Sequence, residues 1–290
     1  MKKQRSIKTA TASDFVNMGP IRLRQPIPTN GIDKVDPFIL LHHYGPYKIS
    51  SESNPFDLGP HPHRGFEPIT FLLKGEQLHR DSLGNESVVK AGDVQWTTAG
   101  RGVIHAEGPT KVFVEKGGEL EGIQLWLNLP KSHKMMPANY QHVKGEDMPV
   151  VKSKDHKTTI RIVSGELENK KGLIKTQTPV NSFIVDIVEG GEYFVNIHSS
   201  HQALVYLLAG DVLINNETAL LYNADQMIVF NNDGDGFTIS ANEDSKLLVL
   251  SGEPLNEPVA NRGPYVMNTQ TEIMEAMRDY QQGKMGFLEN

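Results

Sequence analysis

Two short stretches of this 290-residue chain carry side chains that could bind a metal ion. His61 and His63 lie in HPHRGFE, and His105 and Glu107 lie in GVIHAEG. Residues i and i+2 of a β-strand point to the same face, so the members of each pair would project together from an extended backbone. Pro62 favours such a backbone at the start or edge of a strand. The spacing therefore predicts two pairs of potential ligands on two strands.

The two pairs together offer three imidazoles and one carboxylate to one ion. Residues 64–104 between them carry strand and turn signals, so a barrel can place the two strands side by side with both pairs facing inward. This ligand set suits Fe(II), Mn(II), Ni(II), Cu(II) or Zn(II), and ligand type alone does not choose among them. An octahedral ion with four protein ligands keeps two positions for water, substrate or dioxygen, whereas a structural zinc would close its tetrahedron with the four.

Chance is the competing interpretation for either pair taken alone. The chain has 11 histidines, and one His-x-His pair among them arises often by chance. The second pair follows the glycine-bounded turn 99–102, and its presence favours a metal site. His42 and His43 are predicted to be structural, because many histidines are satisfied core or surface groups. His79 is interpreted as an unpaired wall residue.

Composition excludes several classes of protein. No apolar run approaches the ~18 residues that cross a bilayer, and no apolar stretch follows the basic N-terminus, so neither a membrane span nor a secretory signal is predicted. The lack of cysteine excludes disulfides, thiolate ligands and a thiol nucleophile. The net charge is −6 and the 29 Lys and Arg are scattered, which argues against direct nucleic-acid binding. We expect a cytoplasmic protein.

Short apolar stretches must supply the elements that position the two pairs. Examples are PITFLLKG (68–75), GIQLWLNLP (122–130) and QALVYLLAG (202–210), each bounded by Gly, Pro, Asn or a polar residue. This pattern predicts many short strands in a sandwich or barrel.

A single helix is predicted at about 270–283. Thr269 and Glu272 fit a capping box, and Gly283 supplies a C-terminal stop. Four apolar residues follow the helical period on one face: Ile273, Met274, Met277 and Tyr280. We expect this face to pack on the preceding barrel, with a partner-binding helix as the alternative.

The second half of the chain repeats the first. FLLKG (71–75) resembles YLLAG (206–210), and VIHAE (103–107) resembles TISAN (238–242), both at an offset of 135 residues. Two like barrels in tandem would explain both matches. The polar, proline-containing stretch before residue 159 separates them, so we predict a barrel at 1–135, a connecting segment at 136–158, and a second barrel with the helix at 159–290.

The same offset predicts that the second barrel lacks a metal site. It maps the four potential ligands onto one imidazole, one hydroxyl and two amides, namely Asn196, His198, Ser240 and Asn242. This is a poor set for a transition metal, so we predict a single ion per chain.

Four stretches of the chain resemble signatures of the pirin family of the cupin superfamily. They are HPHRGFE (61–67), AGDVQWTTAGRGVIHAE (91–107), QLWLNLP (124–130) and GPYVMNTQTEI (263–273). The resemblance covers nearly the whole chain. It implies an all-β bicupin, with two tandem cupin barrels, a short C-terminal helix and one non-haem metal in the N-terminal barrel.

The resemblance also assigns roles to individual residues. Its ligands are His61, His63, His105 and Glu107, and the expected ion is Fe(II), with Mn, Ni, Cu, Co or Zn as alternatives. Many other cupins place a ligand at the position of Glu67, but in pirin-like proteins the carboxylate ligand is that of HAE. Glu67 is therefore interpreted as a group that orients an imidazole.

A quercetin 2,3-dioxygenase activity is the function that the resemblance implies. The metal would act as a Lewis acid on the 3-hydroxyl of a flavonol-like enol, and Glu107 would accept its proton before the reaction with dioxygen. Phe66 and Trp126 are interpreted as core residues rather than pocket walls. The alternative is an iron-binding, redox-sensitive regulator that acts through protein partners. In either case we expect a monomer.

Overall fold

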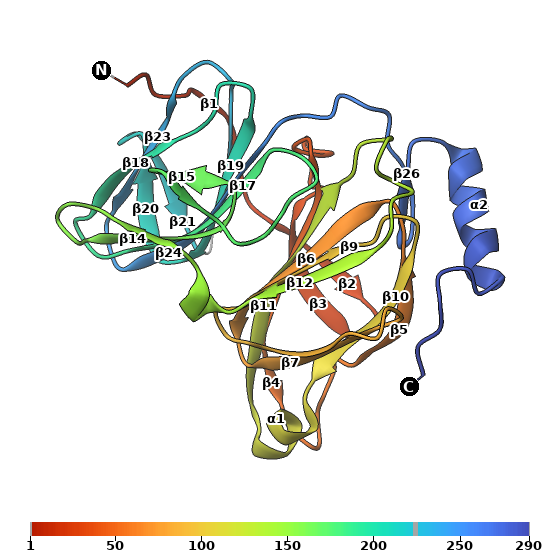
Figure 1. The fold of residues 1–290 in the computed structure, drawn as a ribbon. Helices are drawn as coiled ribbons and strands as arrows, with labels where there is room; N and C mark the ends of the chain where they lie inside the picture. The colour runs from red at the N-terminus through yellow and green to blue at the C-terminus, as the bar shows by residue number, and fades with distance from the viewer. Residues whose placement is uncertain (1, 223–225, 290) are drawn as a thin grey trace. The chain divides into compact units, whose positions relative to one another are not determined.

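The computed structural model describes residues 2–222 and 226–289, and these residues form two compact units of antiparallel β-sheet (Figure 1). The first unit contains residues 15–25, 38–146 and 255–290, and the second contains 1–14, 26–37 and 147–254. Two α-helices lie in the described part of the chain, both in the first unit. No helix there is long and apolar enough to cross a membrane.

The first unit is built from two sheets, with strand orders β12-β9-β6-β11-β4-β3-β2 and β5-β10-β7-β8, and from the pair β25-β26. Its strands are β2 (Asp14–Met18), β3 (Ile21–Ile27), β4 (Phe38–Ile49), β5 (Leu58–His63), β6 (Phe66–Lys74), β7 (Glu76–Asp81), β8 (Glu86–Lys90), β9 (Val94–Thr98), β10 (Val103–Pro109), β11 (Gly118–Asn128), β12 (Asn139–Val143), β25 (Ala260–Arg262) and β26 (Tyr265–Met267). Its helices are α1 (Lys111–Lys116) and α2 (Gln270–Gln281).

The second unit has sheets of order β1-β22-β19-β24-β17-β14-β13 and β18-β23-β20-β21, with the pair β15-β16. Its strands are β1 (Ile7–Thr11), β13 (Val150–Lys152), β14 (Thr158–Ser164), β15 (Glu166–Leu167), β16 (Lys170–Lys171), β17 (Val180–Ile187), β18 (Glu192–Asn196), β19 (Gln202–Ala209), β20 (Asp211–Ile214), β21 (Thr218–Leu221), β22 (Met227–Phe230), β23 (Gly236–Ala241) and β24 (Ser245–Gly252). Its core is aliphatic and aromatic, as in Ile162, Phe183, Val205 and Phe237. The 3₁₀ turn η1 (Gly145–Asp147) falls where the chain passes from the first unit to the second.

The two units repeat one topology. The strand β10 lies between β5 and β7 in the first unit, and β23 lies between β18 and β20 in the second. The repeat seen in the sequence falls on matching strands, because residues 103–107 lie in β10 and 238–242 cover most of β23. The all-β fold with two cupin-like units and a C-terminal helix is therefore confirmed.

The ends of the chain do not follow the linear division predicted from the repeats. β1 pairs with β22, which places the N-terminal strand in the second unit. Residues 255–290, including α2, belong to the first unit. The expected connecting segment 136–158 also has partners, because β12 pairs with β9 and β13 pairs with β14.

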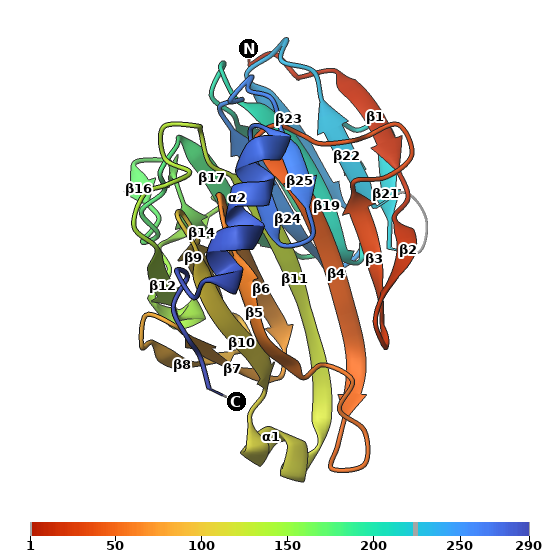
Figure 2. The same cartoon turned by 90° about the vertical axis from the view of Figure 1, so that its right-hand side faces the viewer.

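The C-terminal helix begins as predicted and packs Ile273 and Met277 on the first unit, but it leaves Met274 exposed. The Thr269 hydroxyl accepts a hydrogen bond from the Glu272 amide at 3.2 Å, and the Glu272 carboxylate accepts one from the Thr269 amide at 2.9 Å. Ile273 and Ala276 are buried, whereas Met274 is 69% exposed. The predicted packing of Met274 is wrong, and the small Ala276 packs instead in the cluster that includes Tyr265 and Met267 of β26. The helix lies beside β25 (Figure 2).

Candidate metal centre

Neighbouring strands bring the three predicted histidine ligands together. β5 and β10 are antiparallel, with His61 opposite His105 and His63 opposite Val103. The Nε2 atoms of His61 and His105 lie 2.8 Å apart. The ring centroid of His63 lies 4.9 Å from that of His61 and 4.7 Å from that of His105. Each imidazole offers one nitrogen within 4.8 Å of the other two, which is a spacing that one ion can bridge.

Burial disfavours the charged forms of His63 and His105. His63 and His105 are almost completely buried, and burial, followed by the neighbouring imidazoles, lowers the pKa of each well below its usual value. The Nδ1–H of His61 donates to the Gly59 carbonyl at 2.8 Å, which leaves its Nε2 as a lone-pair donor to a metal.

The polar atoms of this cluster fit a cation. Nε2 of His63 is buried without a hydrogen-bond partner among the described residues, and the Nε2 atoms of His61 and His105 face each other at 2.8 Å. Buried polar atoms are rarely left so in native proteins. A divalent ion bound to the three imidazoles would satisfy nitrogens that otherwise face only one another.

Glu107 lies at the edge of the imidazole cluster, close to His105. Its Oε2 is 3.9 Å from Nε2 of His105. Its Oε1 accepts hydrogen bonds from the Gln95 amide and, at 3.5 Å, from the Thr70 hydroxyl. The Tyr140 hydroxyl in turn donates to Oε1 of Gln95 at 3.3 Å. One carboxylate oxygen is therefore held by β6 and β9, while the other faces the histidines.

His79 lies beside this cluster, as the predicted wall or structural residue would, but it has a partner that the sequence analysis did not identify. It offers a nitrogen within 4.8 Å of ligand atoms of His105 and Glu107. Its Nε2 lies 3.2 Å from Oδ2 of Asp81, and its ring stacks on Tyr140 at a centroid distance of 4.2 Å. The signal was present in the sequence, because His79 and Asp81 have the same i, i+2 spacing as the two predicted pairs.

Glu67 does not orient an imidazole, so that expectation is wrong. Side chains on β6 and β9 alternate between two faces, and Thr70 and Gln95 are on the face of Glu107. Glu67 is on the other face, where the Thr98 hydroxyl donates to it at 2.6 Å. Burial raises the pKa of Glu67 to about 7, opposed by hydrogen bonds from Thr98 and Trp96.

The neighbouring histidines are structural, as predicted. Nε2 of His42 lies 2.8 Å from Oε1 of Gln25, and burial lowers the pKa of His42 to about 4. Nε2 of His43 lies 3.1 Å from Oε1 of Glu121. Both side chains are committed to partners on other strands of their own sheet.

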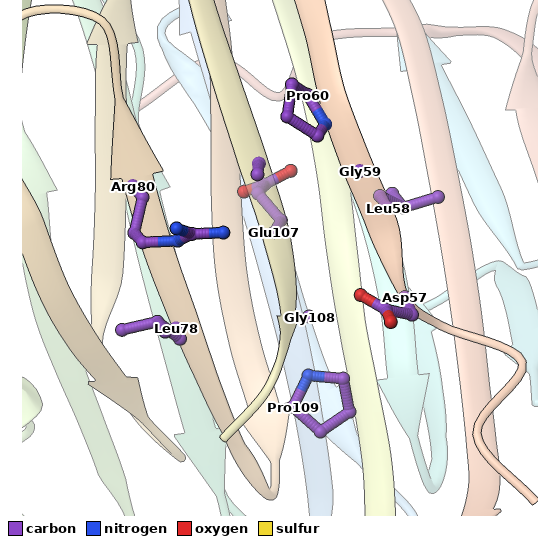
Figure 3. A pocket seen from close by; sticks show the side chains of 10 residues that line it. Asp57, Leu58, Gly59, Pro60, Leu78, Arg80, Glu107, Gly108 and Pro109 are labelled. Atoms are coloured by element: carbon purple, nitrogen blue, oxygen red, sulfur yellow. The ribbon is translucent and has the colours of Figure 1, made fainter. Parts of the chain in front are cut away.

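Two aromatic rings flank the cluster, and a cavity is lined by residues of the strands that carry it. Phe66 and Trp126 stand with their ring centroids 5.2 and 5.8 Å from that of His63, so these expected core residues also wall the histidine. A cavity of about 340 Å³ borders Glu107 and is lined by β5, β7 and β10 (Figure 3). Its polar side chains include Arg80 and Asp57.

The equivalent positions of the second unit are engaged with ordinary polar partners. Nδ1 of His198 lies 2.9 Å from the Ser200 hydroxyl, and Asn242 donates to Asp211 at 2.9 Å. Ser240 donates to Asn216 at 2.7 Å. Both groups of three potential metal ligands found in residues 2–222 and 226–289 lie in the first unit.

Comparison with known proteins gives consistent matches. Residues 20–127 match the family model described as Pirin, and residues 183–286 match the model described as Pirin C-terminal cupin domain. A Pseudomonas aeruginosa protein that is provisionally named a quercetin 2,3-dioxygenase is 36% identical over 250 residues, which is 86% of each chain. The rat protein named pirin is 34% identical over 270 residues, covering 92% of this chain and 88% of that one.

Solved structures show the same similarity. The crystal structure of a quercetin 2,3-dioxygenase from Acinetobacter baumannii has a TM-score of 0.90 and 36% sequence identity, and the match covers 99% of this chain and 100% of that one.

Proposed function

The chain belongs to the pirin family, and from that premise we propose that it is a metal-dependent dioxygenase that opens the ring of a flavonol or a related enol. One observation carries the proposal: three imidazoles converge, two of them almost completely buried, beside a carboxylate with one oxygen held and the other facing His105. The names of the Pseudomonas and Acinetobacter proteins support the same substrate class.

His61, His63, His105 and Glu107 are the proposed ligands of a divalent ion, with Fe(II) as the expected metal. The bound ion supplies Lewis acidity that favours the deprotonated form of the substrate hydroxyl. Glu107 is the group placed to accept that proton when its Oε2 leaves the metal, because Gln95 and Thr70 hold only its Oε1. Phe66 and Trp126 exclude water from one side of His63.

Quercetin turnover tests this proposal. Metal-free protein is loaded under nitrogen with Fe(II), Mn(II), Co(II), Ni(II), Cu(II) or Zn(II), then mixed with quercetin in air. We expect at least one loaded form to bleach the visible absorbance of quercetin and release carbon monoxide. His105→Ala should abolish both signals, and His198→Ala in the second unit is the matched control. Unchanged quercetin absorbance with every metal would contradict the proposal.

A regulator that acts through protein partners is the second candidate, favoured by exposed apolar side chains at the C-terminal end. Met274 on α2 is 69% exposed and Phe287 beyond it is 82% exposed. Capture of partners from cytoplasm by Fe(II)- and Fe(III)-loaded protein tests it. A partner set that changes with oxidation state, and is lost in Met274→Glu, would support regulation; identical sets would exclude it. Light scattering tests the proposed monomer.

A further inference from the structure

The C-terminal segment of the chain, residues 255–290, packs against both strands that carry the histidines. Next to His63, the Arg64 amide donates to the Pro264 carbonyl at 3.3 Å, and the Val266 amide donates to the Arg64 carbonyl at 3.0 Å. Next to His105, the Ile104 amide donates to the Ser82 hydroxyl at 3.0 Å. That hydroxyl donates to the Met285 carbonyl at 3.0 Å. Each histidine strand is thus linked to the segment one residue away from a proposed ligand.

The Arg64 side chain joins three elements of the first unit. It is buried, and its Nε donates to the Arg101 carbonyl at 2.6 Å, in the turn that leads into β10. Its Nη1 lies 3.0 Å from Oδ2 of Asp279 on α2. A buried guanidinium that loses its carboxylate leaves an uncompensated charge, which is costly. The ion pair therefore fixes α2 relative to the ends of β5 and β10.

Lys134 forms a second link between the same parts. Its ammonium is buried and donates to the Gly65 carbonyl at 2.8 Å, to Oδ1 of Asn128 at 2.7 Å and to the Val266 carbonyl at 3.0 Å. All three donors of the ammonium are used. The Lys134 ammonium consequently links the turn after His63 to the strand β26.

Two glycines show how closely the segment approaches the histidine strands. A Cβ added to Gly65 would lie 2.0 Å from the Val266 carbonyl oxygen. A Cβ added to Gly102, just before β10, would lie 2.5 Å from Cγ of Met285. Ile104 completes the contact, because it packs in one apolar cluster with Met267 and Ile273.

We propose that the docking of α2 and the binding of the metal are energetically coupled, with Arg64 and Asp279 as positioning residues for the imidazoles. The inference rests on the metal centre of the proposed function. The C-terminal segment holds the ends of β5 and β10, so it sets the distance between His63 and His105. Coupling is reciprocal: a metal that needs this distance also stabilises the docked helix. A partner that lifts α2 would release the metal.

Co(II) binding to the full-length chain tests the coupling without turnover. Affinity is measured by competition with a chelator, and the ligand field by visible absorption. We expect Asp279→Ala to lower Co(II) affinity about tenfold and to alter the spectrum, and Asp279→Glu to restore both in part. Lys284→Ala is the matched control, because Lys284 pairs with the other oxygen of Asp279 at 2.9 Å from an exposed position. It should leave affinity and spectrum unchanged.

Hydrogen exchange provides the reciprocal measurement. Co(II) should slow exchange in α2 of the wild-type protein but not in Asp279→Ala. Faster exchange in α2 of Asp279→Ala with unchanged Co(II) affinity and spectrum would overturn the coupling and leave only a structural ion pair. If Co(II) binding is coupled to the docking of α2 but quercetin is not turned over, the coupling stands and the proposed dioxygenase activity is contradicted. A wild-type chain that binds no Co(II) would overturn the metal centre and the coupling together.

Discussion

The two carboxylate oxygens of Glu107 have different surroundings. Oε1 is held by the Gln95 amide and the Thr70 hydroxyl, while Oε2 faces His105. Gln95 is itself fixed by the Tyr140 hydroxyl. Groups that hydrogen-bond to a metal ligand orient it, and their loss typically weakens metal binding. The Gln95 amide therefore orients the Glu107 carboxylate toward a metal ion or toward the proton of a substrate.

Gln95→Leu should lower metal affinity by about 10- to 100-fold, because the carboxylate loses the donor that orients it. Chelator competition on the Fe(II)- or Co(II)-loaded protein measures this. Tyr140→Phe removes one hydrogen bond further away and should give a smaller loss. Gln202→Leu, in β19 of the second unit, is the control and should bind metal as the wild type does. Full affinity in Gln95→Leu would show that this amide does not position Glu107.

Glu67 should give the free energy of unfolding a distinct pH dependence. Its folded pKa of about 7 exceeds the ordinary value of 4.5, so the folded chain keeps a proton that the unfolded chain releases between these pH values. This contribution is full below pH 4.5 and is lost as pH rises through 7, by at most about 3 kcal/mol. Urea unfolding of metal-free wild type and Glu67→Gln from pH 4.5 to 8 measures it. The variant should gain relative stability as pH rises, and parallel curves would contradict the assignment.

At the scale of elements, packing closely constrains the turn between β5 and β6. Gly65 has a φ of +87° and lies against the Val266 carbonyl. Gly84, in the turn between β7 and β8, has the same φ of +87° but nothing within 4 Å of the position of a Cβ. A comparison of substitutions at the two glycines therefore separates the cost of a positive φ from the cost of a steric clash.

Gly65→Ala should destabilise the protein by several kcal/mol, and Gly84→Ala by only about 1 kcal/mol. Both variants place a side chain at positive φ, but only the first drives a methyl group into backbone atoms of β26. Urea unfolding at one pH compares the two directly. Equal losses would show that β26 can move away from the turn without cost.

The sequence predicts elements better than it predicts the faces they bury. The capping box placed the start of α2 correctly, because Thr269 and Glu272 bond to each other's backbone and need no tertiary partner. The buried face was wrong at Met274, since periodicity counts apolar side chains and does not know which neighbour is close. His61, His63 and His105 were predicted to converge from local spacing, whereas Gln95 and Tyr140 reach Glu107 only through sheet neighbours.

At the scale of the whole molecule, the sequence pattern did not predict which unit each end of the chain joins. The internal repeat predicts two linear halves, but β1 pairs with β22 and residues 255–290 pack on the first unit. Long-range pairings of this kind depend on which sheet edge is open, and a hydrophobic pattern does not record that. The fold class was predicted correctly because the repeat matches and three of the four family signatures lie mainly in strands.

The two units have the same topology, but we expect only the first to bind a metal ion. Metal-free protein should take up one equivalent of Fe(II) or Co(II), measured by elemental analysis after gel filtration. At a free metal concentration 100 times the Kd, binding should raise the free energy of unfolding by about 2.7 kcal/mol. Hydrogen exchange should slow in β5, β7 and β10, where the ligand groups lie, and stay constant in β18, β20 and β23.

His105→Ala should lose the equivalent of metal, and His198→Ala should retain it, because the second unit offers at the matching positions only one imidazole among amides and a hydroxyl. Two tightly bound ions per chain, or equal protection in both units, would mean that the second unit assembles a site from residues outside the repeat. A single ion retained in His105→Ala would place the metal outside the β5–β10 pair. Either result would mean that the matching positions of the two units do not determine where the metal binds.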